Sequence, residues 1–247
     1  MSFRTATLAG IALAATLLAA GTAQAGAIDT LNVTYFTAPA GPDFGNLTVD
    51  GVYTNMVTST LGPDGLPVYN PNYGGTPAND VNSNGELTWW TPSTTTGITQ
   101  TSTGTVTLPF ANNNFYAPNG TGTNDSTEFQ TAIFSGTFTL ASPEKLTFTL
   151  GADDDAFLYV DGTIVSDLGG IHADSQAPVT TTTLGAGTHT LKLFYADRDQ
   201  TQAALNFGIT TTGVTITAVP EPGSLALLGT GLIGLGLILR RRNRNRV

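Results

Sequence analysis

The chain has 247 residues, of which 40% are hydrophobic and 9% aromatic, and it contains no cysteine. This composition is sufficient for a folded core and excludes full disorder, disulfide scaffolds and cysteine-ligated zinc. Between residues 26 and 219, three cations face seventeen carboxylates, so the basic surface that nucleic acid binding requires is missing and we expect no nucleic acid partner. The length suits one large all-β domain or two ordinary ones.

The N-terminal segment has the parts of a secretory signal. Arg4 supplies a basic region, residues 8–20 form an apolar stretch, and residues 23–25 (Ala-Gln-Ala) have the small-x-small pattern that signal peptidase accepts. We therefore expect signal peptidase to cleave between Ala25 and Gly26. An uncleaved N-terminal anchor is the less favoured alternative, because the apolar stretch is short and a cleavage site follows it directly.

The body between residues 26 and 218 shows no sustained helical period. Short alternating segments recur instead, which is typical of β-strands. In residues 157–165, two apolar segments flank Asp161-Gly162, and this pattern predicts a hairpin with a type I′ turn. Together with glycine-rich turns, the spacing predicts a single antiparallel β-sandwich. The clearest alternating segments are residues 137–140, 146–150, 191–193 and 205–209.

The first half of the body is less regular. Residues 62–85 hold Gly-Pro-Asp-Gly, Asn-Pro-Asn and Gly-Gly turn signals, and residues 91–107 are almost all Thr, Ser and Gly. We interpret both stretches as long loops carried on the sandwich and not as a second domain. The threonine-rich stretch could instead be an edge strand, because threonine suits strands.

Trp89 and Trp90 are candidate ligand-binding residues, because aromatic rings stack on sugar faces. Adjacent residues of a strand point to opposite faces, so at most one of the two could face a ligand. Core packing of both indoles is the favoured alternative.

Asp153, Asp154 and Asp155 are the most informative run in the body. Three adjacent carboxylates repel one another, so the fold must separate, solvate or neutralise them. Their oxygens suit Ca²⁺, which takes about six to eight oxygen ligands. We predict a calcium site on these three residues, completed by oxygens from elsewhere in the chain. The alternative is a solvated acidic turn whose side chains cap backbone amides.

Three further polar residues have both a functional and a structural interpretation. His172 is a candidate ligand, but we favour a structural role in which it ties down a turn. Asp167 is interpreted as a turn-former. Arg198 is expected to pair with Asp197, with Asp199 or with the aspartate run.

No constellation typical of catalysis is present. The chain lacks a Gly-x-Ser-x-Gly elbow and a phosphate-binding Gly-x-x-x-x-Gly-Lys loop, and neither His172 nor His189 accompanies a recognisable nucleophile. The acidic residues offer many carboxylate pairs of the kind that glycosidases use, but no pair is marked out. We assign no catalytic residue and expect that the protein is not an enzyme.

Three elements follow one another at the C-terminus. Residues 219–224 (Val-Pro-Glu-Pro-Gly-Ser) break helices, residues 225–239 are apolar, and residues 240–246 carry five arginines. Fifteen helical residues span about 22 Å, less than the roughly 30 Å hydrocarbon core, so the span is marginal. The arginines should remain cytoplasmic by the positive-inside rule.

This tail closely resembles the PEP-CTERM sorting signal of Gram-negative bacteria. The resemblance implies processing by an exosortase, transient passage through the inner membrane over residues 225–239, and export to the cell envelope, surface or extracellular matrix. A plain single-pass anchor is the alternative, which would change the final attachment but not the compartment. The sorting motif implied by the resemblance comprises Val219, Pro220, Glu221 and Pro222, with Glu221 as a recognition residue.

The body is similar to the fibro-slime relatives of the protective-antigen-like β-sandwich. Residues 153–162 (Asp-Asp-Asp-Ala-Phe-Leu-Tyr-Val-Asp-Gly) and residues 167–172 (Asp-Leu-Gly-Gly-Ile-His) match that family's signature. Lectin-like members of the wider family hold Ca²⁺ on two successive aspartates, and the ion bridges to sugar hydroxyls. The resemblance implies this role for Asp153 and Asp154.

These observations predict a signal peptide over residues 1–25, a β-sandwich over residues 26–218 and a sorting tail over residues 219–247. We expect an exported, non-catalytic surface or matrix protein that binds carbohydrate or exopolysaccharide, with Ca²⁺ as cofactor. A purely structural biofilm-matrix component without a specific ligand is the main alternative. A glycan-modifying enzyme is the less favoured one.

Overall fold

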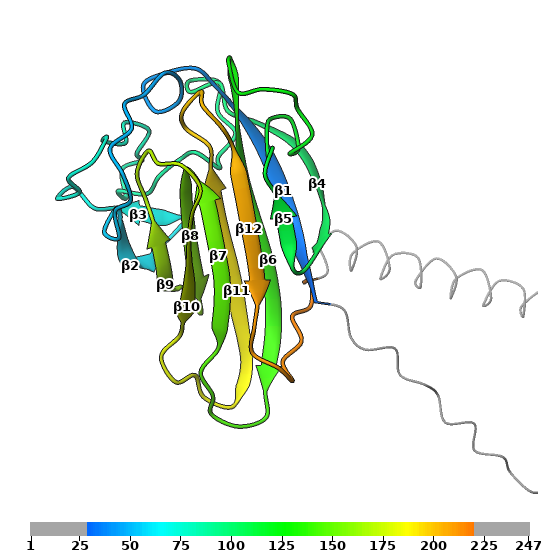
Figure 1. Cartoon of the computed structure of the whole chain (residues 1–247). Helices are drawn as coiled ribbons and strands as arrows, with labels where there is room; N and C mark the ends of the chain where they lie inside the picture. The colour runs from blue at the N-terminus through cyan, green and yellow to red at the C-terminus, as the bar shows by residue number, and fades with distance from the viewer. Residues whose placement is uncertain (1–28, 220–247) are drawn as a thin grey trace, which may run out of the picture.

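The structure is a computed structural model that describes residues 29–219 (Figure 1). The predicted signal peptide, and the predicted sorting tail beyond Val219, lie outside the described residues. The described part of the chain is all-β, as predicted. Among these residues no helix is long and apolar enough to cross a membrane.

Residues 29–219 contain twelve strands, and every pairing between them is antiparallel. The strands are β1 (Thr30–Pro39), β2 (Val57–Leu61), β3 (Pro67–Tyr69), β4 (Thr99–Thr107), β5 (Phe110–Asn112), β6 (Glu128–Leu140), β7 (Thr147–Asp153), β8 (Asp155–Val160), β9 (Thr163–Leu168), β10 (Ser175–Thr180), β11 (Gly187–Ala196) and β12 (Ala204–Ile209).

The strands form two sheets. Eight strands make the large sheet in the order β3-β2-β9-β8-β11-β6-β1-β4, and four make the small sheet in the order β10-β7-β12-β5. Figure 1 shows the small sheet lying across one face of the large sheet. This is the sandwich that the alternating segments predicted, because each sheet buries one apolar face against the other.

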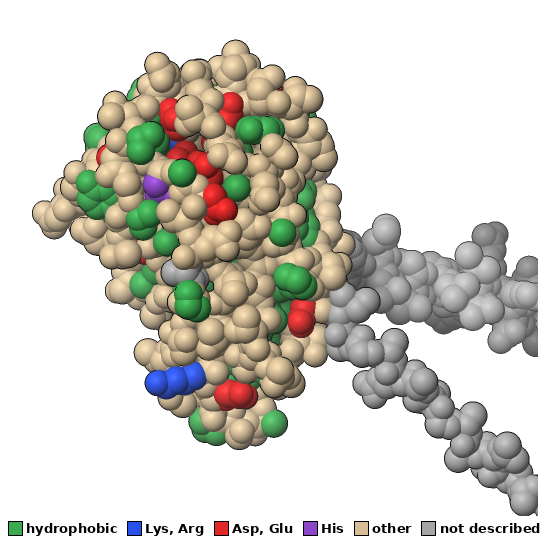
Figure 2. Space-filling model, viewed as in Figure 1, with side chains coloured by type: hydrophobic (Ala, Val, Ile, Leu, Met, Phe, Trp, Pro, Cys, Tyr) green, Lys and Arg blue, Asp and Glu red, His purple; other side chains and the backbone are tan. Residues whose placement is uncertain are grey.

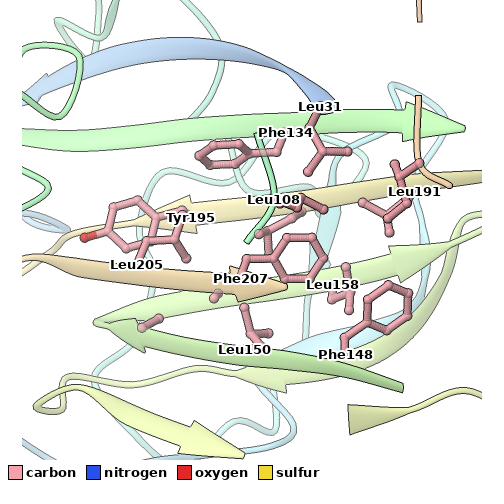
Figure 3. Packing of buried hydrophobic residues seen from close by; sticks show 14 of the residues in the cluster. Leu31, Leu108, Phe134, Phe148, Leu150, Leu158, Leu191, Tyr195, Leu205 and Phe207 are labelled. Carbon is pink, nitrogen blue, oxygen red and sulfur yellow. The ribbon is translucent and has the colours of Figure 1, made fainter. Parts of the chain in front are cut away.

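The main core lies between the two sheets. Apolar side chains from the inner faces of β1, β6, β8 and β11 meet those of β7 and β12 (Figure 3). Examples from the large sheet are Phe134 and Leu158, and examples from the small sheet are Phe148, Leu205 and Phe207. Each is almost fully buried, a state that contributes about 1.5–3 kcal/mol per side chain of this size.

A second core covers the opposite face of the large sheet. Strand β8 is buried along its whole length because Ala156, Leu158 and Val160 face the main core while Phe157 and Tyr159 face the second one. The loops between β1 and β4 supply the other wall of this core. Their contributions include Phe44, Met56, Tyr73, Leu87, Trp89, Trp90 and Ile98.

The local predictions are largely confirmed. The hairpin β8–β9 turns at Asp161 and Gly162, whose φ values of 51° and 72° fit a type I′ turn. The stretch 62–85 is loop except for β3. Residues 99–107 form β4, the edge strand of the large sheet, so for these residues the edge-strand alternative is correct and the loop interpretation is wrong.

Candidate functional site

The aspartate run is located where the chain crosses from one sheet to the other. Strand β7 of the small sheet ends at Asp153, β8 of the large sheet begins at Asp155, and the peptide bond between Asp153 and Asp154 is cis. The three residues are at most 4% exposed. The alternative of a solvated acidic turn is therefore wrong about solvation, but its expectation that these side chains cap backbone amides is confirmed for Asp154 and Asp155. Acidic side chains gather at this end of the molecule in Figure 2, near the upper end of β7 in Figure 1.

Asp154 is held by three backbone N–H groups. Its Oδ2 accepts from the amides of Arg198 and Asp199 at 2.8 and 2.9 Å, and its Oδ1 accepts from the amide of His172 at 3.0 Å. Burial raises the pKa of Asp154, although the three donors act in the opposite direction. The side chain thus joins the crossover to the β9–β10 loop and the β11–β12 loop.

Asp155 points toward the second core, where it meets Arg198. Its Oδ2 lies 3.6 Å from a terminal guanidinium nitrogen of Arg198, and both side chains are fully buried. The Oδ1 atom accepts from the amide of Gly170 at 2.8 Å. Arg198 also donates from Nε to the Asp43 carbonyl at 3.0 Å and lies 4.7 Å above the ring of Trp89. The predicted partner of Arg198 in the aspartate run is therefore Asp155, which leaves Asp153 and Asp154 as the calcium candidates.

Asp197 points to the other side of the large sheet from Arg198. It is fully buried, and neither of its carboxylate oxygens has a hydrogen-bond partner. Burial and then repulsion from Asp154, Asp125 and Asp153 raise the pKa of Asp197 well above its usual range. Asp125, 5% exposed, likewise has one buried oxygen without a partner.

Asp153 belongs to the same group of carboxylates. Burial, followed by the charge of Asp154, raises its pKa to about 8. Among residues 29–219 the ion pairs are His189–Asp161 and Arg198–Asp155, so no basic side chain neutralises Asp153 or Asp197. Buried carboxylates in this state must either keep a proton or gain a cation.

We call Asp125, Asp153, Asp154 and Asp197 the acidic cluster. Carboxylate oxygens are the type of ligand that a hard cation such as Ca²⁺ prefers, and several of those in the cluster are buried without a hydrogen-bond partner. Within the described residues, however, no three His, Cys, Asp or Glu side chains converge in a way that could hold a metal ion. The cluster therefore fits an ion only if backbone carbonyls, water or a ligand supply additional oxygens.

The other predicted site residues have structural partners. His172 bonds the Ala173 carbonyl through Nδ1 at 2.9 Å, consistent with the favoured structural role. Asp167 lies in β9, where its Oδ2 accepts from the distant amide of Val57 at 2.9 Å, so the turn-former interpretation is wrong. Asp199 accepts from the amide of Leu47 at 2.9 Å and does not pair with Arg198.

Trp89 and Trp90 are core residues, 0% and 3% exposed. The Nε1 of Trp89 donates to Asp43 Oδ2 at 2.7 Å, and that of Trp90 donates to the Tyr195 carbonyl at 2.8 Å. The glycan-platform interpretation is therefore wrong, and the favoured alternative of core packing is correct for both. The argument from opposite strand faces does not apply, because neither tryptophan belongs to a strand.

Asp125 and Asp197 are the cluster residues that the sequence analysis does not identify. Asp125 lies outside any strand and carries no local signal, and Asp197 enters the sequence analysis only as a possible partner for Arg198. The alternation of side chains at the end of β11 could have predicted the position of Asp197, because Tyr195 faces the main core and Ala196 faces the second one. Continuing this period places Asp197 and Arg198 on opposite sides.

Comparison with known families identifies two segments. Residues 111–221 match the model of the PA14 domain, and residues 218–242 match that of the PEP-CTERM protein-sorting motif. A PA14 β-sandwich domain and a C-terminal PEP-CTERM sorting motif are thus present, as the two resemblances predicted. The sorting motif indicates an exported protein of a Gram-negative bacterium.

Individual proteins show more distant similarity. Protein psiR of Dictyostelium discoideum is 26% identical over 191 residues, which is 66% of this chain and 19% of that protein. The structural match to a PA14 sugar-binding domain from an RTX adhesin covers 77% of this chain and 96% of the adhesin domain, at 17% sequence identity and with a TM-score of 0.37. The epithelial adhesin 9 A domain of Candida glabrata, solved with Galβ1-4GlcNAc, covers 76% and 86% at 14% identity, also with a TM-score of 0.37.

Part of an enzyme is also similar. The GH31 alpha-xylosidase of Xanthomonas citri matches 46% of this chain at 19% identity, with a TM-score of 0.34. The match covers 13% of that enzyme.

Proposed function

We propose that the described domain is a non-catalytic carbohydrate-binding module of an exported surface or matrix protein, and that a calcium ion at the acidic cluster takes part in binding. The observation that carries this proposal is the set of buried carboxylates on Asp153, Asp197 and Asp125, which no basic side chain neutralises. Burial, and then repulsion between the carboxylates, raises their pKa values, and a divalent cation would offset both effects.

Asp153 and Asp154 would hold the ion, with Asp197 beneath them as a further carboxylate. Asp174 in the β9–β10 loop is exposed and close enough to raise the pKa of Asp153 through its charge. The cluster is therefore next to solvent on the Asp153 side. An ion there could bind sugar hydroxyls in its remaining coordination positions, which is the role that the resemblance to lectin-like sandwiches implies.

The PEP-CTERM motif supports the proposed export route. We propose that signal peptidase removes residues 1–25, that residues 225–239 hold the chain transiently in the inner membrane, and that an exosortase then processes the sorting motif. The domain would reach the cell surface or the extracellular matrix, where polysaccharides are the abundant ligands.

Glycan binding tests the proposal. The full-length chain is applied to a glycan array and to immobilised bacterial exopolysaccharide, in millimolar Ca²⁺ and in chelator. We expect binding in calcium that is lost in chelator and in the Asp153→Asn/Asp154→Asn double variant. Asp167→Asn, which changes a buried carboxylate in β9 outside the cluster, should retain binding.

Three outcomes would contradict the proposal. Equal glycan binding in calcium and in chelator would remove the ion from the binding site. Absence of binding to every glycan, with the protein folded and calcium present, would favour a structural matrix component. Release of reducing sugar from the polysaccharide would instead indicate an enzyme.

A further inference from the structure

The described chain ends in a segment that is bonded to the fold as far as the first residue of the predicted sorting motif. We call residues 214–219 the C-terminal segment. Its Thr217 exchanges two backbone hydrogen bonds with Thr137 of β6, at 2.8 and 2.9 Å. The carbonyl of Val219, the first residue of the motif, accepts from the side-chain amide of Asn32 in β1. Figure 1 shows these last described residues beside the beginning of β1.

The C-terminal segment occupies a place that β1 leaves open. The pairing of β1 with β6 runs only as far as Asn32 opposite Ser135, although β6 is longer and continues beyond that point. Thr217 pairs with β6 at the next stretch, opposite Thr137. The segment therefore extends the large sheet where β1 begins, and it satisfies backbone groups of β6 that β1 does not reach.

Ile216 fixes the C-terminal segment in the main core. Its side chain is fully buried, its N–H donates to Oδ1 of Asp29 at 2.7 Å, and its carbonyl accepts from the N–H of Thr30 at 3.0 Å. Gly136 of β6 makes room for it, because a Cβ there would lie 2.6 Å from Leu31 and 2.9 Å from Ile216. A glycine inside a strand often marks such a close approach. The segment is thus a packed part of the domain.

We propose that the C-terminal segment must leave its place on β1 and β6 before an exosortase can process the sorting motif, so that its release sets the rate of processing. This inference rests on the proposed export route and adds a control step to it. An enzyme that cleaves a peptide bond must reach the backbone around that bond, and the residues before Pro220 are engaged in the contacts described above. Only molecules with a released segment are competent, and the apparent affinity for the enzyme falls by that fraction.

A disulfide between the C-terminal segment and β6 tests the proposal, because the chain has no natural cysteine. Thr137 and Thr217 exchange both backbone hydrogen bonds, and the Cα atoms of such a pair lie about 5.5 Å apart, a distance that a disulfide can bridge. Processing of the full-length Thr137→Cys/Thr217→Cys variant is followed by mass in membranes that contain an exosortase. We expect no processing of the oxidised variant and processing at the wild-type rate after reduction.

Thr139→Cys/Thr188→Cys is the matched control. These exposed threonines lie opposite one another on β6 and β11, with their hydroxyls 3.1 Å apart, so their disulfide would join two strands of the same sheet and leave the C-terminal segment free. The control should be processed like the wild type in both redox states. Processing of oxidised Thr137→Cys/Thr217→Cys at the wild-type rate, or an equal loss in the two disulfide variants, would overturn the proposal.

A substitution that loosens the C-terminal segment should have the opposite effect and requires no cysteine. Ile216→Ala removes the buried side chain, and we expect the initial rate of processing to rise by at least about tenfold, because the released state becomes more populated. Leu87→Ala is the control, since Leu87 is equally buried but lies in the second core, on the opposite face of the large sheet. Equal processing rates of the two variants would contradict a specific role of the segment.

This inference and the proposed function can fail separately. Processing that ignores both the Thr137–Thr217 disulfide and Ile216→Ala would overturn the inference and leave the export route intact. Absence of processing in the wild type and in every variant, reduced Thr137→Cys/Thr217→Cys included, would overturn the export route and this inference with it. Neither outcome bears on calcium or glycan binding.

Discussion

Arg198 divides the aspartates of the crossover into two environments. Its guanidinium lies on the second-core side of the large sheet, where it pairs with Asp155 and stacks on Trp89. The carboxylates of Asp153 and Asp197 lack such a partner. The same buried end of the fold therefore contains one neutralised acid and a set of acids that needs a proton or an ion.

Removal of this cation should destabilise the fold. Arg198→Met keeps most of the side-chain volume but leaves Asp155 buried without a countercharge, and we expect a loss of about 3–5 kcal/mol in the free energy of unfolding. Adding Asp155→Asn should recover much of that loss, because the amide can still accept from Gly170 without carrying a charge. Urea denaturation of the two single variants and the double variant measures the coupling. Additive effects of the two changes would contradict the pairing.

At the residue scale, the sequence predicts that the aspartate run is important. It does not predict which of the aspartates pairs with Arg198 and which lack a basic partner. Adjacent carboxylates signal a special environment in any sequence. Which of them meets Arg198 depends on the crossover between sheets, and Asp125 comes from a loop distant in sequence. The pairing of Asp167 with Val57, 110 positions apart, is equally invisible to local patterns.

At the element scale, patterns that repeat within a strand were predictable. Alternation located parts of β6, β7, β11 and β12, and the Asp-Gly pair located the β8–β9 turn. The uninterrupted apolar run of β8 is typical of a strand buried on both faces. The second core was missed because its other wall consists of loops, whose apolar residues follow no period.

The turn between β8 and β9 offers a matched test of backbone strain. Gly162 has a φ of +72° and no neighbour that an added Cβ would meet. Gly162→Ala should therefore lower the free energy of unfolding by about 1–2 kcal/mol, because alanine is strained at a positive φ even where its Cβ contacts nothing. Gly185→Ala is the control, since its Cβ would also meet no neighbour and its φ is not positive. Thermal denaturation showing equal effects at the two positions would refute the type I′ assignment.

At the scale of the whole molecule, the acidic cluster connects the layers. Asp153 ends a strand of the small sheet, Asp197 follows a strand of the large one, and Asp154 bonds the loops on both sides. A cation held here would bind only when both sheets are assembled. Ion binding would therefore stabilise the entire fold and not just one loop.

Thermal unfolding of the full-length protein in calcium or in chelator tests this account most directly. An ion that binds only the folded state at a hundredfold excess over Kd adds about 2.7 kcal/mol, which corresponds to roughly 5–10 °C in Tm for a protein of this size. We predict this rise for the wild type and for Asp167→Asn, and its loss in Asp153→Asn/Asp154→Asn. An identical Tm in millimolar calcium and in chelator would contradict the calcium site.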